Sequence, residues 1–183
     1  MSMNKLFYYI IILPISYLPN YMLYAFSNLL CLIIGRIIGY RKNIIIKNLK
    51  NSFPEKNDIE INKIKIDFYK HFCDLLIESF LGFTISKNKI EEKIKINNQD
   101  FLNKFSNEGK NVILIGGHYN NWEMSAQRLP LISHHKVYAI YKPLKNEFFN
   151  GKVKYSREKF GLKMVPMKNS KKYFTNKTNK PRA

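Results

Sequence analysis

Cysteine is scarce in this sequence, and its scarcity argues against two kinds of site. The 183 residues include two cysteines, Cys31 and Cys73, which are far apart and lie in apolar surroundings. The sequence contains no CxxC pair and no cysteine spacing typical of metal ligands, so a metal or thiol-redox motif is not expected. Both cysteines are predicted to be buried thiols in a protein of a reducing compartment.

Acidic side chains are also few. The chain carries 13 aspartates and glutamates against 31 lysines and arginines, a net charge of +18. Such an excess indicates anionic partners, and nucleic acid and anionic membrane surfaces are the two usual ones. The lysines are scattered singly and form no recognition motif with interleaved aromatic residues, so a nucleic acid partner is not expected.

One long apolar run is present, near the amino terminus. Residues 6–40 carry a single charge, Arg36, and are interrupted by Pro14 and Pro19. Residues 21–39 are long enough to cross a membrane, and the basic residues that follow place the carboxyl side in the cytoplasm by the positive-inside rule. We therefore expect membrane insertion or tight monotopic attachment. The alternative is a pair of buried core helices broken at Pro19, because Arg36 sits inside the run.

The next segment predicts a scaffold helix. After a break at residues 51–54, Asp58 is positioned to cap a helix that continues to about Leu81, with apolar residues at helical spacing. Residues 87–109 are polar and poorly periodic. They are expected to hold a short edge strand, around Ile94 and Ile96, and a short helix.

The second half of the chain predicts the α/β class. Strands are expected at residues 111–115, 137–141 and 162–165, and helices at 120–129 and 146–160. This alternation is typical of a parallel sheet flanked by helices.

The domain organisation follows from these elements. Residues 1–42 are expected to form a membrane anchor, 43–168 an α/β domain, and 169–183 a polar, basic tail without a further strand. A sheet of three strands would leave its edges exposed, so the fold is expected to be incomplete at its carboxyl end.

The most informative residues follow the first predicted strand. Gly116 and Gly117 close that strand, His118 comes next, and Glu123 stands five positions further on in the predicted helix. In open α/β sheets, sites form beyond the carboxyl ends of the strands. An imidazole held by a carboxylate takes a proton from a hydroxyl, because the carboxylate fixes the tautomer and stabilises the imidazolium. His118 is therefore a candidate general base and Glu123 its orienting partner.

These histidines have other possible assignments. A histidine that caps a helix or is bonded within a turn is the structural alternative for His118. No serine or cysteine stands in a nucleophile elbow, so a covalent Ser-His-Asp scheme has little support. His134 and His135 are adjacent and have no evident third ligand, so a zinc site is not expected and both are predicted to be exposed loop residues.

Several blocks resemble one protein family. Residues 117–123, Gly-His-Tyr-Asn-Asn-Trp-Glu, are similar to the GHxGNWE block of the bacterial lipid A late acyltransferases (lauroyl/myristoyl acyltransferases), within the lysophospholipid acyltransferase group. One departure is Asn120, which stands where the family usually has glycine. The family's NLxxxFP, YRPLxN and RxxFG blocks are matched in the same order at residues 48–54, 141–146 and 157–161.

The resemblance implies a fold, an activity and partners. Family members have a glycerolipid acyltransferase-like α/β fold. They transfer an acyl chain from an acyl-carrier-protein thioester to a hydroxyl of a lipid A precursor, at the cytoplasmic face of the inner membrane. No cofactor is implied beyond the carrier-bound donor. His118 and Glu123 would be catalytic, and Asn121, Arg157 and Lys142 would bind substrate, with the helix start near Asn121 supplying donors to the oxyanion.

Two alternatives stay open. One is an acyltransferase that uses the same dyad on a glycerophospholipid. The other is an inactive, truncated basic protein that binds a membrane, because residues 175–183 match none of the family's further blocks. The acyl chain length, the acceptor lipid and the oligomeric state do not follow from these residues.

Overall fold

A computed structural model describes residues 2–175 of the chain. It divides into two compact units, one formed by Met1–Ser16 with Leu81–Ala183 and the other by Tyr17–Phe80. We describe each unit by itself. The domain boundaries expected after residues 42 and 168 remain predictions.

The unit Tyr17–Phe80 is helical. It contains α3 (Asn20–Cys31), a π-helical continuation η2 (Leu32–Ile38), α4 (Lys42–Ser52) and nearly all of α5 (Asp58–Leu81). Together α3 and η2 form an apolar helical run, Asn20–Ile38, that is long enough to cross a membrane by length and composition. The helix predicted over residues 21–39 is thus confirmed, and it weakly suggests membrane association.

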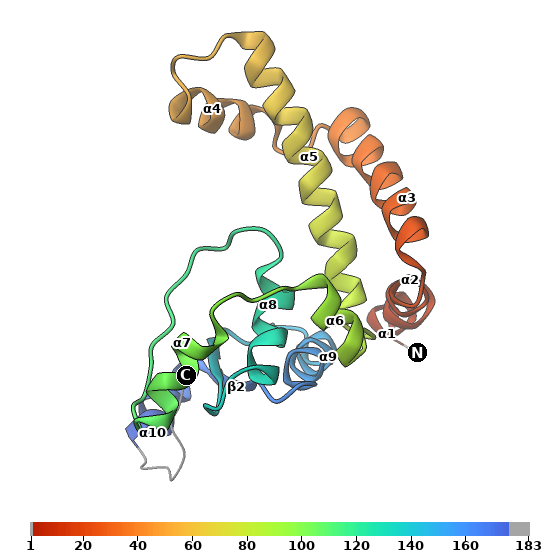
Figure 1. The fold of residues 1–183 in the computed structure, drawn as a ribbon. Helices are drawn as coiled ribbons and strands as arrows, with labels where there is room; N and C mark the ends of the chain where they lie inside the picture. The colour runs from red at the N-terminus through yellow and green to blue at the C-terminus, as the bar shows by residue number, and fades with distance from the viewer. Residues whose placement is uncertain (1, 176–183) are drawn as a thin grey trace. The chain divides into compact units, whose positions relative to one another are not determined.

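The helix α3 lies beside α5 (Figure 1), and hydrogen bonds join the two. The Ser27 hydroxyl donates to Oδ1 of Asp74 over 2.5 Å, and the Tyr24 hydroxyl donates to Oε1 of Glu78 over 2.7 Å. Ser27 is 1% exposed. The opposite face stays open, since only 11% of the most apolar window of the run is buried.

The start of α5 differs from the prediction in its capping residue. Oδ1 of Asn57 accepts the backbone N–H groups of Ile59 and Glu60, both over 3.0 Å, and a carboxylate oxygen of Glu60 accepts the N–H of Asn57 over 3.1 Å. This reciprocal pattern is a capping box. Asp58 lies inside the first turn, where its negative charge still faces the positive end of the helix dipole, so the cap assigned to Asp58 was wrong by one residue.

Both cysteines of this unit are free thiols. Cys73 is fully buried, as predicted, and burial raises its pKa to about 11. Cys31 is only half-buried.

The other unit combines helices with a small sheet. Its amino-terminal part is α1 (Met3–Phe7), η1 (Tyr8–Ile12) and α2 (Leu13–Ser16). The Tyr8 ring packs edge-on against Phe83 and Phe148, with ring centroids 5.5 Å apart in both pairs. The remaining elements are α6 (Lys87–Lys93), α7 (Gln99–Asn107), α8 (Trp122–Arg128), η3 (Leu129–Leu131), β1 (Tyr138–Tyr141), α9 (Glu147–Glu158), β2 (Lys163–Pro166), η4 (Met167–Asn169) and α10 (Ser170–Thr175). The basic tail after Thr175 lies outside the described residues.

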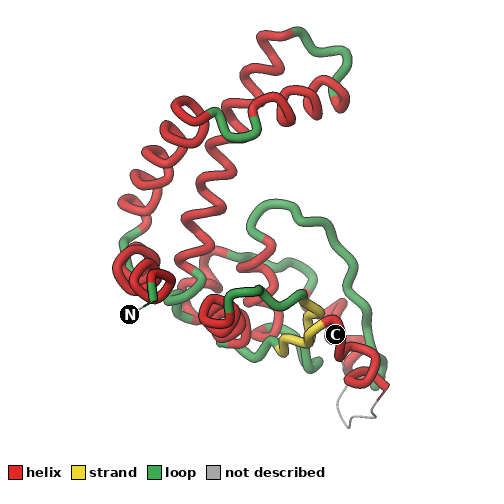
Figure 2. The backbone as a smooth tube through the Cα atoms, turned by 180° about the vertical axis from the view of Figure 1, so that it is seen from behind, coloured by secondary structure: helices red, strands yellow, loops and turns green. Residues whose placement is uncertain are grey.

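The sheet is a parallel pair, β1 and β2, in which Tyr138 lies opposite Lys163 and Tyr141 opposite Pro166 (Figure 2). Val137, Leu162 and Met164 form its buried core, against which Ala126, Leu129, Ala139 and Tyr141 pack. The predicted order of helix, strand, helix and strand over residues 120–165, and the parallel sense of its strands, are confirmed. The helix-rich unit is consistent with an α/β acyltransferase.

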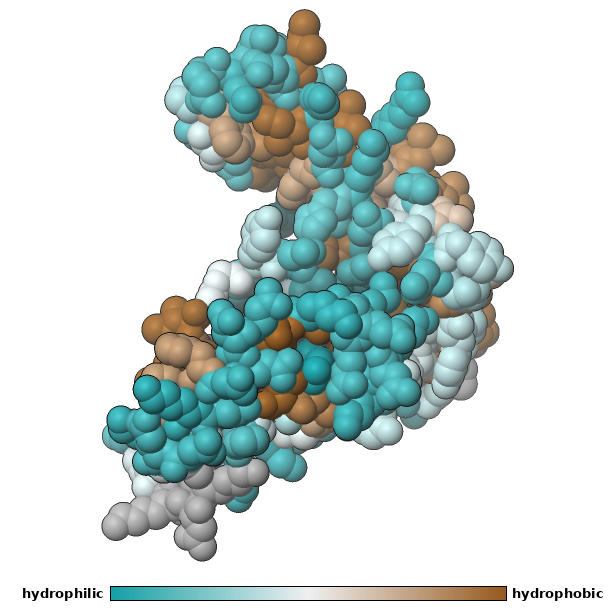
Figure 3. Space-filling model, in the orientation of Figure 1, coloured by the Kyte–Doolittle hydropathy of each residue, from teal (hydrophilic) through white to brown (hydrophobic). Residues whose placement is uncertain are grey.

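Two predicted strands do not form. Ile94–Ile96 links α6 to α7 without strand structure, and residues 110–119 form a long loop (Figure 2). Within residues 2–175 the sheet consists of β1 and β2, which pair with each other. An apolar run becomes a strand only where a neighbour satisfies its backbone groups. Here Ile113 and Ile115 are 86% and 93% exposed, and the loop shows apolar surface in Figure 3.

A chain of buried hydrogen bonds fixes α8 against α9. Nε2 of Gln127 donates to Oγ of Ser156 over 3.1 Å, and that hydroxyl donates to the Gly82 carbonyl over 2.9 Å. Gln127 and Ser156 are 3% and 6% exposed. One hydroxyl therefore links two helices and the segment that follows α5.

Replacing Ser156 with Ala should lower the free energy of unfolding by about 1–3 kcal/mol, because a buried amide donor and a buried carbonyl lose their shared partner. Chemical unfolding of the full chain in detergent measures the change. Ser125→Ala is the matched control: its hydroxyl bonds the Asn121 carbonyl at an exposed position, so its removal should cost less. Equal losses in the two variants would contradict a special role for Ser156.

Candidate functional site

The site begins where the long loop turns into α8. Asn121 is the N-cap of this helix: its Oδ1 accepts the backbone N–H of Met124 over 3.1 Å, and the residue is 9% exposed. The Asn121 side chain, which was predicted to bind substrate, thus caps the helix and fixes where the first turn of α8 starts. Substrate contact by its backbone remains a prediction.

Asn120, the residue before the cap, has a left-handed backbone with φ of +52°. Glycine adopts this conformation without strain, and asparagine tolerates it better than most residues. This accounts for the departure noted in the sequence, since the family block usually has glycine here. Asparagine preserves the turn that brings His118 close to the start of α8.

His118 lies at the end of the loop rather than at the end of a strand. Its side chain is exposed, and its ring packs edge-on against Trp122, with ring centroids 4.4 Å apart and planes inclined by 62°. Among residues 2–175 the imidazole makes no hydrogen bond. It is thus open to solvent and packed on one side against the indole.

Glu123 is bound to Arg157 of the neighbouring helix α9. Nε of Arg157 donates to Oε2 of Glu123 over 2.9 Å, and Nη2 donates to Oε1 in a second, shorter contact. Both side chains keep some contact with solvent, at 20% and 25% exposure. The guanidinium carbon also lies 5.8 Å from the centroid of the Trp122 ring.

Trp122 therefore contacts both the imidazole of His118 and the guanidinium of Arg157. His118, Glu123 and Arg157, all predicted from the sequence, are gathered around one indole ring. The expected hydrogen bond between His118 and Glu123 does not occur in the described chain, and the catalytic dyad stays a prediction. The Arg157–Glu123 ion pair was not predicted, because a pair between residues 34 positions apart leaves no periodic pattern in the sequence. The one indication in the sequence was that Glu123 and Arg157 each stand in a block that resembles the family.

Lys142, the remaining predicted substrate contact, is not part of this cluster. It is exposed just after β1, and its side chain forms no hydrogen bond or ion pair within the part of the chain that the structure describes. Lys159, the residue that follows α9, is more constrained. Its Nζ donates to the Ile85 carbonyl over 2.6 Å, and burial lowers its pKa.

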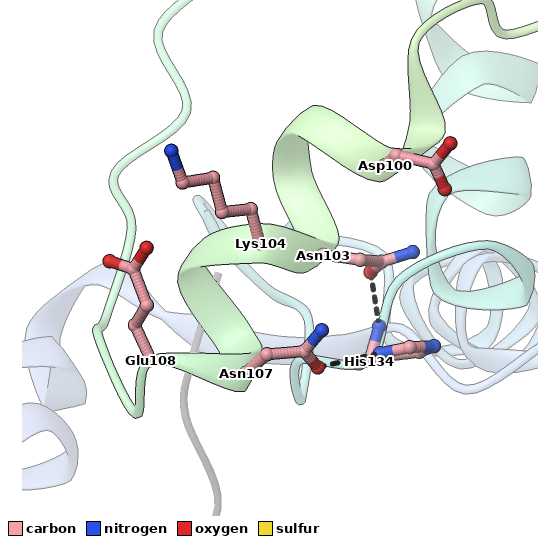
Figure 4. Close-up of a pocket in the computed structure, with 6 residues that line it drawn as sticks. All are labelled: Asp100, Asn103, Lys104, Asn107, Glu108 and His134. Atoms are coloured by element: carbon pink, nitrogen blue, oxygen red, sulfur yellow. Dashed lines mark hydrogen bonds between the residues drawn. The ribbon is translucent and has the colours of Figure 1, made fainter.

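A separate polar hollow of about 480 Å³ opens on α7 (Figure 4). It is lined by Asp100, Asn103, Lys104, Asn107, Glu108 and His134. His134 lies exposed at its rim, with its backbone N–H bonded to Asn103 and its ring to Asn107. None of the predicted site residues lines this hollow.

His135 differs from the prediction. It was expected in an exposed loop, but it is 4% exposed, with Nε2 3.1 Å from the Lys110 carbonyl and Nδ1 3.3 Å from the Ser133 hydroxyl. A buried imidazole is satisfied when both nitrogens are bonded, and one of the two partners, the Lys110 carbonyl, lies 25 positions away in the chain.

The left-handed turn makes Asn120 a sensitive position. Asn120→Gly should leave the unfolding free energy nearly unchanged, because glycine adopts positive φ freely. Asn120→Val should lower it by about 1–2 kcal/mol, because a branched side chain clashes in this conformation. Thermal unfolding of both variants measures the difference. Valine and glycine variants of equal stability would contradict a left-handed backbone at position 120.

Comparison with known proteins gives one result. The model of the bacterial lipid A biosynthesis acyltransferase family matches residues 2–182. Searches of curated proteins and of solved structures give no match. Because the family match spans almost the whole chain, the protein belongs to the bacterial lipid A biosynthesis acyltransferase family, and this membership supports an acyltransferase function.

Proposed function

We propose that this protein transfers a fatty acyl chain from an acyl-carrier-protein thioester to a hydroxyl of a lipid A precursor. The observation that carries the proposal is the exposed imidazole of His118, packed on Trp122 beside the Glu123–Arg157 pair, in a member of this family. An exposed imidazole next to a carboxylate has the chemistry that removes a proton from an alcohol.

In the proposed reaction, His118 takes the proton of the acceptor hydroxyl as its oxygen attacks the thioester carbonyl. The tetrahedral intermediate then collapses, the carbon–sulfur bond breaks, and the imidazolium returns a proton to the leaving thiolate. The products are the acylated lipid and the free carrier thiol. Glu123 favours this sequence by orienting the imidazole and stabilising its charged form.

Donors around the site support the negative charge that develops. Attack on a carbonyl creates an oxyanion, which needs positive or hydrogen-bond-donating groups aimed at it. We assign this task to the backbone N–H groups at the start of α8, next to Asn121. Arg157 and, further away, Lys142 are assigned to anionic groups of the substrates.

We further propose that the exposed face of α3 and η2 attaches the protein to the inner membrane, with the catalytic unit on the cytoplasmic side. Apolar residues such as Leu29 and Ile37 are 54% and 72% exposed, and apolar surface is visible along α3 in Figure 3. Basic residues that would attract anionic lipids follow on α4 and just before it: Arg41, Lys42, Lys47 and Lys50.

The catalytic proposal is tested by His118→Ala. Loss of the general base should reduce acyl transfer to a lipid A precursor by roughly 10²–10⁴-fold. The matched control is His134→Ala, an exposed histidine outside the cluster, which should transfer acyl chains at the unmodified rate. Transfer that persists in the first variant would rule out the imidazole as the base.

The membrane proposal is tested by the double substitution of Leu29 and Ile37 by Ser. Inserting one such side chain contributes about 1.5–3 kcal/mol, so binding to anionic vesicles should fall at least about tenfold. Vesicle flotation measures the bound fraction. The control is Ile59→Ser, since Ile59 is 83% exposed but lies on α5. Unchanged flotation of the double variant would place the attachment elsewhere.

A further inference from the structure

Glu123 has a partner that the proposed reaction does not need. In that reaction its carboxylate serves the imidazole of His118, but in the structure both carboxylate oxygens accept hydrogen bonds from Arg157. The guanidinium neutralises the carboxylate, so a neighbouring imidazolium gains less from it. The observed arrangement is therefore weaker as a catalytic base than a direct His118–Glu123 pair.

We propose that the Arg157–Glu123 pair is a resting state, and that a phosphate group of a substrate releases Glu123 by taking its place on Arg157. Glu123 then turns to His118 and completes the dyad. Arg157 is in this view a positioning residue that couples substrate binding to activation of the base. The inference rests on the proposed function and names the regulation of the same site.

The geometry of Arg157 supports the exchange. A guanidinium binds a carboxylate and a phosphate through the same two-pronged pattern, so the two anions compete for it. Glu123 occupies Nε and Nη2, while no hydrogen bond of Nη1 is observed within residues 2–175. The pair is 20% and 25% exposed, which leaves an approaching phosphate a path to the guanidinium.

The position of Trp122 supports a short movement of Glu123. The imidazole centroid of His118 lies 4.4 Å and the guanidinium carbon of Arg157 5.8 Å from the centre of the same indole ring. Glu123 is the next residue along α8. In the proposed exchange, the Glu123 side chain rotates and the exposed loop that carries His118 adjusts, so that the carboxylate meets the imidazole.

The rival explanation is a permanent ion pair that only fastens α8 to α9. The two explanations differ in how the pKa of His118 depends on Glu123. A permanent pair leaves the pKa of His118 equally insensitive to Glu123 with and without a phosphate ligand. The exchange makes that pKa depend on Glu123 once a phosphate occupies Arg157, whereas removal of Arg157 frees Glu123 under both explanations.

The experiment is a double-mutant cycle read by NMR on the full chain in detergent micelles, with ¹³C-labelled histidine. The His118 resonance is assigned from its loss in His118→Ala, and its pKa is measured in the unmodified protein and in E123Q, R157Q and the E123Q/R157Q double variant. We expect E123Q to change the pKa less when Arg157 is present than in the R157Q background, because the paired carboxylate makes no direct contact with the imidazole. In the R157Q background, E123Q should lower it by at least about one unit, the size typical of a lost carboxylate neighbour.

Two ligands distinguish the source of the phosphate. Phosphatidic acid added to the micelles presents the phosphomonoester of a lipid, and a holo acyl carrier protein presents the phosphodiester of the donor arm. At least one should raise the His118 pKa of the unmodified protein, and E123Q should abolish that rise. K154Q is the matched control, because it also removes a positive charge and an ion pair from α9. The resonance of buried His135 reports whether each variant folds.

Several outcomes would overturn the inference. These are an equal effect of E123Q with and without Arg157, a His118 pKa that neither ligand changes, or a response of K154Q that matches R157Q. Since the NMR readout requires no turnover, these results are separable from a failure of the proposed function, which would appear as acyl transfer that survives His118→Ala.

Discussion

The contact between α8 and α9 is the constraint on which the site depends. On its buried side, Gln127 and Ser156 join the two helices and bind the segment after α5. On its outer side, Glu123 and Arg157 join them again, with Trp122 packed alongside. A buried hydrogen bond and a partly exposed ion pair thus fix α8 against α9, and they bring together residues from two distant parts of the chain. That pairing places the Glu123–Arg157 ion pair next to Trp122, the residue that the His118 ring contacts.

The site is built from short-range turns held by long-range contacts. Asn120 supplies the left-handed turn and Asn121 the cap, so the last loop residues and the first turn of α8 have a defined shape. The loop that precedes them exposes apolar side chains over residues 113–115. The imidazole of His118 therefore lies where an exposed loop meets a helix start of defined shape.

The helical unit Tyr17–Phe80 has an uneven surface. One face of α3 is bound by polar contacts from Ser27 and Tyr24 to carboxylates of α5, and its other face exposes large apolar residues. The carboxylates that bond α3 would have to enter the hydrocarbon layer together with the helix if it crossed a membrane. That is costly, because buried charges lose their hydration. This surface is better suited to attachment at a membrane interface than an evenly apolar helix would be.

The sequence by itself determined the local elements and the family. Periodicity placed α5, α8, α9, β1 and β2, and the blocks around His118 and Arg157 identified relatives, because side-chain patterns and short motifs are properties of neighbouring residues. Only the tertiary structure decided which partner each group takes. The run Val112–Ile115 is a loop because no described neighbour completes its ladder, His135 is buried because Lys110 and Ser133 bond its ring, and Glu123 pairs with Arg157 because α8 lies beside α9. Such choices depend on distances between residues far apart in the chain, which spacing along the sequence does not record.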